Sequence, residues 1–326
     1  MAREGVARLT DEEFASIWAS CKSSPALFRD KTGMAMSAIY RRRASLAKRG
    51  IVLETIPQSG AAPGAWSSIK NTHRQHLPVE IGTGTIIAFS DAHYWPGEIT
   101  TAHKALIKLI KQLKPSIIIA NGDVFDGARI SRHGRIGWEN SPSVKQELEA
   151  VEERLHEIIM ASPNGCRHYW TWGNHDLRFD TFISNHADQL EGLVGMSLED
   201  RFPEWEFATT IDINGELIVK HRYHNGVHAG YNNALKSGRS ICTGHLHRLL
   251  VTPFGDYNGR RWGIDTGTLA DPDGPQFGYM EGNPAPWCSG FAVISFHEGR
   301  LVPPELVEVI DNRAWFRGGL VYDGQE

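Results

Sequence analysis

The sequence predicts an α/β protein with a small all-α domain at its N-terminal end, and three observations lead to this expectation. From about residue 84 onward, short apolar runs alternate with amphipathic helical patterns, the order typical of α/β domains. Several of these apolar runs stop at clusters of polar residues. Residues 1–56 show mainly helical patterns and are basic, and 326 residues suffice for one large and one small domain.

Composition argues against membrane, exported and disulfide-rich classes of protein. The chain has no run of about 18 apolar residues, so no membrane span is expected. Its first residues, MAREGVARLTDEEF, lack the apolar core of a signal peptide, which predicts a cytoplasmic location. The four cysteines are scattered without a C-x-x-C pair, which favours reduced thiols over disulfides or a zinc clip.

Helical patterns divide the small domain, residues 1–56, into three elements. In the first, Thr10 is a suitable N-cap ahead of an acidic turn, and apolar side chains recur at helical spacing. A short second helix is expected around residues 26–28. The third begins near Met36 or Ser37 and has a basic flank at residues 41–43. The apolar residues are Phe14, Ile17 and Trp18 in the first element and Ala26, Leu27 and Phe28 in the second, and a buried side with Ile39, Leu46 and Ala47 is expected in the third.

Three helices with a basic last helix resemble a helix-turn-helix module, which implies contact with DNA or RNA. Residues 1–55 hold ten Lys and Arg against six Asp and Glu, whereas the whole chain has a net charge of −4. The alternative is a bundle for oligomerisation or docking with solvated arginines. Residues 51–55 could form a strand or wing, and residues 57–80, rich in Pro, Gly, Ala and Ser, predict a linker.

The large domain is expected at residues 81–326. Buried strands are expected in TIIAFSDAH, SIIIANGDVFD and RHYWTWGNHD, with amphipathic helices in ITTAHKALIKLIKQLK and SVKQELEAVEERLHEIIM between them. Two later strands are expected in GELIVKH and SICTGHLH. Ligands of open α/β sheets bind beyond the carboxyl ends of the strands, so the polar clusters there should meet in space.

These strand ends carry residues that bind metals. Seven oxygen and imidazole ligands are too many for one catalytic zinc, but they suit two divalent ions that share one carboxylate, with Asp123 as the bridge. The predicted ligands are Asp91, His93, Asp123, Asn174, His221, His245 and His247.

The ordered motifs D-x-H, G-D-x-x-D, G-N-H-D, H and G-H-x-H, over residues 91–247, resemble the calcineurin-like metallophosphoesterase superfamily. The resemblance implies a four-layer α/β/β/α sandwich with two mixed sheets and a pair of metal ions at one edge. Mn²⁺ is the expected metal, with Fe or Zn²⁺ as alternatives. The implied ligands are Asp91, His93, Asp123 and His247 for the first ion, and Asp123, Asn174, His221 and His245 for the second.

The fourth motif departs from the family pattern, which usually has H-G where this chain has His221-Arg222. His224 and His228 are alternatives to His221 as the ligand. His221 is favoured because it ends an apolar strand and leaves a helix-length segment before the next strand.

The resemblance also implies the roles of the remaining motif residues. A water that bridges the two ions loses a proton near neutral pH and attacks phosphorus as hydroxide. His175 protonates the leaving group or stabilises the transition state, and Asp126 orients His175. Asp126 could instead cap a helix. Asp176 is expected to anchor its loop rather than bind metal.

The motif details favour a phosphodiester substrate. Phosphoprotein phosphatases of this superfamily typically show G-D-x-x-D-R-G and G-N-H-E, whereas this chain has GDVFDGARI and GNHD, as in phosphodiesterase and nuclease branches. The insert ARISRHGR predicts phosphate contacts, although a solvated loop is the alternative. The contact residues would be Arg129, Arg132, His133 and Arg135. Residues 271–290, rich in Gly, Pro and aromatic residues, are expected at the rim of the site.

Three functions are therefore open. The first is a two-metal phosphodiesterase or nuclease that its N-terminal domain directs to nucleic acid. The second is a phosphomonoesterase that acts on a nucleotide or a phosphoprotein. The third is a nucleic-acid-binding regulator with an inactive esterase fold, which the complete ligand set disfavours.

Overall fold

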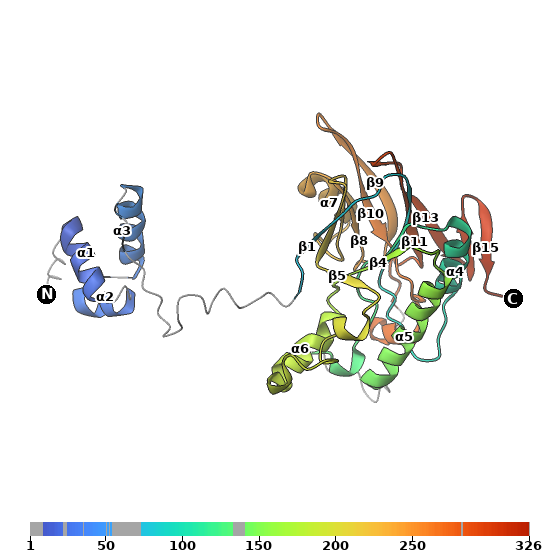
Figure 1. Cartoon of the computed structure of the whole chain (residues 1–326), viewed down its shortest axis with the longest axis horizontal. Coiled ribbons are helices and arrows are strands. Elements are labelled where there is room, and N and C mark those ends of the chain that lie inside the picture. The colour runs from blue at the N-terminus through green and yellow to red at the C-terminus, as the bar shows by residue number, and fades with distance from the viewer. Residues whose placement is uncertain are drawn as a thin grey trace. The chain divides into compact units, whose positions relative to one another are not determined.

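The computed structural model describes residues 9–21, 25–34, 36–49, 51, 53, 73–132, 141–281 and 283–325. The chain divides into two compact units, Met1–Asn71 and Thr72–Glu326, which we describe separately (Figure 1).

The small unit contains three helices in its described residues, α1 (Asp11–Ser20), α2 (Pro25–Thr32) and α3 (Met36–Lys48). Thr10 caps α1 as predicted, and its side chain accepts from the backbone N–H of Glu13 in a capping box. The side chain of Ala47, which was expected on the buried side of the third helix, lies outside the described residues. The same is true of most of the strand or wing expected at residues 51–55. The buried core consists of Phe14, Trp18, Cys21, Phe28, Ile39 and Leu46.

Two arginines of the predicted basic flank stabilise this small bundle. Arg42 pairs with Asp11 at 2.7 Å, and the guanidinium of Arg43 lies 4.4 Å from the centre of the Trp18 ring. Part of the local positive charge therefore holds the helices together.

The large unit contains two mixed sheets in its described residues. The nine-stranded sheet has the order β15-β14-β13-β11-β2-β3-β4-β5, with β12 beside β11. The six-stranded sheet has the order β1-β6-β7-β8-β10-β9. The large sheet consists of β2 (Gly84–Phe89), β3 (Ile117–Ala120), β4 (Arg167–Thr171), β5 (Glu206–Ala208), β11 (Gly290–His297), β12 (Arg300–Leu301), β13 (Glu305–Ile310), β14 (Arg313–Phe316) and β15 (Gly319–Asp323). The small sheet consists of β1 (His76–Val79), β6 (Thr210–Ile213), β7 (Leu217–Val219), β8 (Ser240–Thr243), β9 (Leu249–Asp256) and β10 (Gly259–Thr266).

Helices cover the outer faces of the two sheets, which confirms the predicted four-layer arrangement (Figure 1). Alternate residues of β2 and β3 pack against α4 (Thr101–Leu113) and α5 (Val144–Ala161), while the residues between them pack against the small sheet. On its other face the small sheet contacts α7 (Ala229–Ser237). The remaining helical segments are α6 (Leu177–His186) and the 3₁₀ turns η2 (Ala128–Ile130), η3 (Asp188–Leu190), η4 (Glu199–Arg201) and η5 (Pro275–Met280).

The expected linker range extends too far toward the large domain. Residues 76–79 form β1, which pairs in parallel with β6 in the small sheet. This strand has only four residues and contains Pro78, so its local sequence pattern is a weak indication of a strand, although its side chains alternate between exposed and buried. Its partner lies far along the chain, and the pairing rather than local preference makes it a strand.

None of the described helices is both long and apolar enough to cross a membrane. All four cysteines are free, as expected from their spacing.

Candidate metal centre

The predicted ligands follow strands from both sheets. Strands β2, β3 and β4 run parallel, so the segments that follow them meet at one edge of the large sheet. Asp91 and His93 follow β2, Asp123 follows β3, and Asn174 follows β4. Strands β7 and β8 of the small sheet are also parallel. They are followed by His221, and by His245 and His247.

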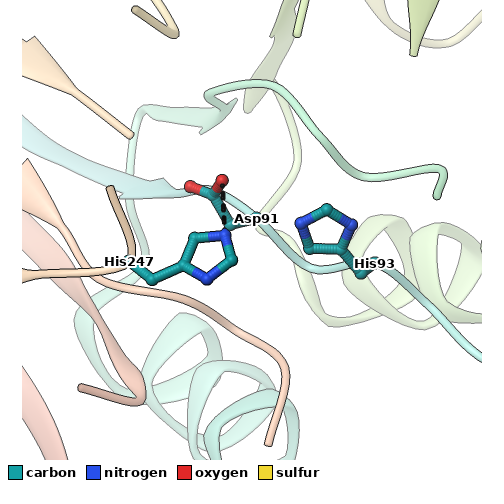
Figure 2. A group of neighbouring side chains, drawn as sticks. All are labelled: Asp91, His93 and His247. Carbon is teal, nitrogen blue, oxygen red and sulfur yellow. Dashed lines mark ion pairs between the residues drawn. The ribbon is translucent and has the colours of Figure 1, made fainter. Parts of the chain in front are cut away.

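One group of potential ligands consists of Asp91, His93 and His247, which are all buried (Figure 2). The Nε2 atom of His247 lies 3.2 Å from Oδ1 of Asp91. Each residue offers a ligand atom within 4.8 Å of those of the other two. This group contains three of the four ligands predicted for the first ion.

A second group consists of Asp123, His221 and His245. The Nε2 atom of His221 lies 3.0 Å from Oδ2 of Asp123. His221 is buried, whereas His228 is exposed and the backbone N–H of His224 bonds to Asn233. Among the described residues, the ligand groups include His221 and neither alternative.

The unsatisfied atoms of the site fit divalent cations. Burying a polar atom without a partner costs free energy, so such atoms are uncommon in proteins. The pairs His221–Asp123 and His247–Asp91 are close, yet Nε2 of His221 and Oδ1 of Asp91 make no hydrogen bond. Oxygen and imidazole atoms that approach one another in this way suit a shared cation. The buried ligand atoms without a hydrogen-bond partner are Oδ1 of Asp91, Nε2 of His93, Oδ1 of Asn174 and Nε2 of His221.

The backbone at these positions is strained. Non-glycine residues rarely adopt positive φ angles, and those that do concentrate at functional sites. Gly122, which precedes Asp123, also has a positive φ of 81°. The predicted ligands with positive φ are Asp91 (51°), His93 (39°), Asp123 (52°), His245 (70°) and His247 (54°).

Hydrogen bonds from neighbouring groups orient the ligands. Asp91 Oδ2 accepts from the hydroxyl of Ser90 and from the backbone N–H of His245 at 2.9 Å. His221 Nδ1 donates to the carbonyl of Asn121 at 2.8 Å, which leaves Nε2 to face Asp123. The ligand atoms are therefore held in position by bonds to their opposite sides.

Asp126 contacts both His175 and the predicted ligand His93. Its Oδ1 accepts from Nδ1 of His93 at 2.8 Å and from Nδ1 of His175 at 2.9 Å. Because a carboxylate only accepts, both imidazoles carry a proton on Nδ1 and expose Nε2 on the other side. The contact with His93 was not predicted. The N-cap residue of η2 is Gly127 and not Asp126, so the capping alternative is wrong.

Asp176 anchors the loops after β3 and β4, as predicted. Its Oδ2 accepts from the backbone N–H groups of Asp123 and Gly173 and from the Trp170 indole, at 2.9, 2.9 and 3.0 Å. Its Oδ1 accepts from the backbone N–H groups of Val124 and Phe125, at 3.0 and 3.1 Å. One buried carboxylate therefore joins the loops that carry Asp123 and Asn174.

Gly173 allows these loops to approach closely. A Cβ atom at this position would lie 2.1 Å from Oδ1 of Asp123 and 2.2 Å from its backbone nitrogen. Only glycine fits, which explains the first residue of the G-N-H-D motif.

Burial and neighbouring charges shift the pKa values of these groups in opposite directions. Burial alone would raise the pKa of Asp123, but the imidazoles of His221 and His175 outweigh it and hold it well below its usual range. Burial likewise opposes protonation of His221, but Asp123 and Asp91 raise its pKa to about 10. The site without ions thus keeps a proton on His221 where a cation would need the lone pair.

Two of the four predicted substrate-contact residues, Arg129 and Arg132, lie within the described residues. Arg129 donates to the carbonyls of Ser141 and Pro142, so it closes the ends of the insert. Arg132 is exposed. His133 and Arg135 lie outside the described residues. A phosphate contact by any of these side chains stays a prediction.

Two further residues of the site, Arg178 and Glu147, were not predicted as functional residues. The guanidinium of Arg178 lies against His175, and the buried carboxylate of Glu147 accepts from the backbone N–H groups of Gly127 and Ala128. The spacing of three residues between His175 and Arg178 could have indicated a shared helical face.

Aromatic residues of the expected rim segment lie beside the ligands. The rings of Phe277 and Trp287 lie 5.3 and 4.6 Å from that of His247, and Tyr279 is 51% exposed next to Phe277. Residues 271–290 thus contribute to the surroundings of the site, as predicted.

Comparison with known families agrees with this geometry. Residues 84–243 match the model of the calcineurin-like phosphoesterase family, a range that runs from β2 to the end of β8. His245 and His247 follow directly after it. A search of the curated proteins gave no match. Residues 84–243 are therefore similar to a calcineurin-like phosphoesterase domain, and this family implies a metal-dependent hydrolase of phosphoric esters.

Proposed function

We propose that this protein hydrolyses phosphodiester bonds with the help of two divalent metal ions, and that its substrate is a nucleic acid. One observation carries the metal-dependent activity: two largely buried groups of ligand residues, some of whose ligand atoms make no hydrogen bond, lie near His175, which the carboxylate of Asp126 orients. Asp91, His93, Asp123 and His247 would hold one ion, and Asp123, Asn174, His221 and His245 the other. When bound, these ions would supply an activated water and offset negative charge on the phosphoryl oxygens.

His175 is the proposed general acid. Asp126 fixes its orientation through Nδ1, so Nε2 is the atom that faces the reaction. His175 would act as the acid in its doubly protonated form, which burial opposes but the neighbouring Asp123 and Asp126 favour, because they raise its pKa. In hydrolysis, the oxygen of water bonds to phosphorus and its proton passes to solvent, the bond from phosphorus to the leaving oxygen breaks, and the leaving oxygen takes the proton from Nε2. The products are an alcohol and a phosphate monoester.

Two features support a nucleic acid as the substrate. The exposed ring of Tyr279 and the partly exposed ring of Trp287, which flank the buried Phe277 near His247, suit stacking of a base, since every base has a π face. The small unit has an excess of positive charge. Because Arg42 and Arg43 stabilise the bundle, nucleic acid would have to bind through the other basic residues of residues 1–55.

A second candidate is a phosphomonoesterase that acts on a nucleotide or a phosphoprotein. The absence of an arginine directly after Asp126 disfavours it in the sequence. Arg178, however, brings a guanidinium to within 3.1 Å of Nε2 of His175, where it could contact a phosphate dianion.

A substrate panel distinguishes these functions. With Mn²⁺, Fe²⁺ or Zn²⁺, the wild type should hydrolyse bis-p-nitrophenyl phosphate and single- or double-stranded DNA, and EDTA should stop the reaction. Asp123→Ala and His175→Ala should lose activity, and His228→Ala, at an exposed histidine outside the ligand groups, is the matched control. Turnover of p-nitrophenyl phosphate alone would favour the monoesterase. DNA binding without any turnover would favour the inactive regulator.

The role of the small unit is tested separately. Deletion of residues 1–55 should weaken binding to DNA or RNA and leave turnover of bis-p-nitrophenyl phosphate intact. If nucleic-acid affinity is unchanged by the deletion, the small unit has a different role, such as docking or oligomerisation.

A further inference from the structure

Arg178 lies at the proposed catalytic histidine without a close acidic partner. Its Nη1 donates to the backbone carbonyl of Asp126 at 2.8 Å, and its Nη2 lies 3.1 Å from Nε2 of His175. Among the described residues, its one carboxylate within 4.0 Å is Asp126, whose Oδ2 lies at that limit. The side chain is 20% exposed, so solvent reaches part of it.

The contact with His175 has a defined direction. Nδ1 of His175 faces the carboxylate and the carbonyl of Asp126, which only accept, so Nδ1 carries the proton. Nε2 is therefore an acceptor, and Arg178 donates to it. In this arrangement Arg178 occupies the nitrogen that would have to face the leaving group.

Gly127 makes room for Arg178. A Cβ atom at Gly127 would lie 3.2 Å from Cδ and 3.3 Å from Cβ of Arg178, and 2.9 Å from Cε1 of Phe125. The aliphatic part of Arg178 thus passes over the position directly after Asp126. Arg178 of α6 therefore brings a cation to the site, whereas the position directly after Asp126, in the segment after β3, holds a glycine.

We propose that Arg178 binds a non-bridging phosphoryl oxygen of the substrate and frees Nε2 of His175 as it does so. A phosphoryl oxygen carries negative charge, so it is a stronger acceptor for a guanidinium than a neutral imidazole nitrogen. Substrate binding would then complete the site, because the same movement neutralises phosphate charge and leaves Nε2 free to take up the proton that His175 gives to the leaving oxygen. This inference rests on the proposed phosphoesterase function.

Inorganic phosphate is the probe for this role. We would measure its binding to the Mn²⁺-loaded protein by calorimetry, for the wild type, Arg178→Gln and Arg178→Lys. Arg201→Gln is the matched control, because Arg201 lies near α6 over the ring of Phe179 and pairs with Glu152 outside the site. Metal content and thermal melting establish that each variant is folded and loaded.

Loss of the charged hydrogen bond should weaken phosphate binding about 10- to 100-fold in Arg178→Gln. Arg178→Lys should give an intermediate value, since lysine keeps the charge and loses the planar fork. Arg201→Gln should match the wild type. If Arg178→Gln binds phosphate as tightly as the wild type, or if the loaded wild type binds none, the proposal is wrong.

Steady-state kinetics give an independent readout. In Arg178→Gln, KM for p-nitrophenyl phosphate should rise more than KM for bis-p-nitrophenyl phosphate, because a monoester offers more charge to the guanidinium. An arginine that only positions His175 would lower kcat for both esters and leave phosphate affinity unchanged. A wild type that binds phosphate through Arg178 but hydrolyses no ester would refute the proposed function and not this binding role.

Discussion

Replacement of Asp176 by asparagine tests how the two halves of the metal centre are held together. The Asp176 carboxylate accepts three N–H groups on Oδ2 and two on Oδ1. Asparagine has a single acceptor oxygen, and its NH₂ group must replace one of these two oxygens. At least two of the five N–H groups therefore lose their acceptor and face another donor.

The magnitude follows from this count. An unsatisfied buried donor costs about 1–3 kcal/mol, so Asp176→Asn should lower the free energy of unfolding by roughly 2–6 kcal/mol. The loops with Asp123 and Asn174 should also loosen, and the protein should retain less metal. Amide hydrogen exchange should become faster in the peptide that spans residues 122–126.

Urea unfolding, monitored by tryptophan fluorescence, and metal analysis after gel filtration measure these effects. Asp188→Asn is the matched control, because the exposed Asp188 side chain accepts, among the described residues, a hydrogen bond from the adjacent N–H of Gln189 and joins no distant segments. A loss below about 1 kcal/mol with normal metal content would show that Asp176 does not join the loops as argued.

Three further predictions concern the same site. Gly173→Ala should abolish metal retention, because its Cβ would overlap Asp123, and metal analysis at equal protein concentration checks this. Burial and the charge of Asp126 raise the pKa of Glu147 to about 8. This value lies above the pKa of a glutamate in the unfolded chain, so the unfolded state loses its proton first as the pH rises. Between pH 5 and pH 8, the free energy of unfolding of the wild type should therefore fall by on the order of 1–3 kcal/mol relative to that of Glu147→Gln. Urea unfolding at several pH values measures this, and an equal pH dependence in the two proteins would contradict the burial argument. At pH 8, Mn²⁺ binding should release about one proton from His221, whose pKa is about 10 without ions. Calorimetry in two buffers with different ionisation enthalpies measures this proton release. If His221→Gln releases the same number of protons, the proton comes from another group.

The fold of the large unit was predictable where local pattern and strand order agree. Strands β2, β3 and β4 are apolar runs that alternate with helices, and this pattern depends on burial of each segment on both faces. The strands β1, β5 and β6 are short, and their identity depends on partners far along the chain. The antiparallel strands β13 to β15 have partly exposed faces, and neither they nor the buried strand β11 were assigned.

The sequence by itself predicted the residues of the candidate metal centre as a set. Ligands at the ends of parallel strands must converge, so spacing and residue type were sufficient to name Asp91, Asp123 and Asn174 together. The residues that match the family model include these three, and the two ligand groups contain Asp91 and Asp123 but not Asn174. Tertiary structure decided which atoms are free to act, because orientation depends on contacts between distant segments. It alone shows that Asp126 holds both His93 and His175, and that α6 brings Arg178 to a position that glycine leaves open.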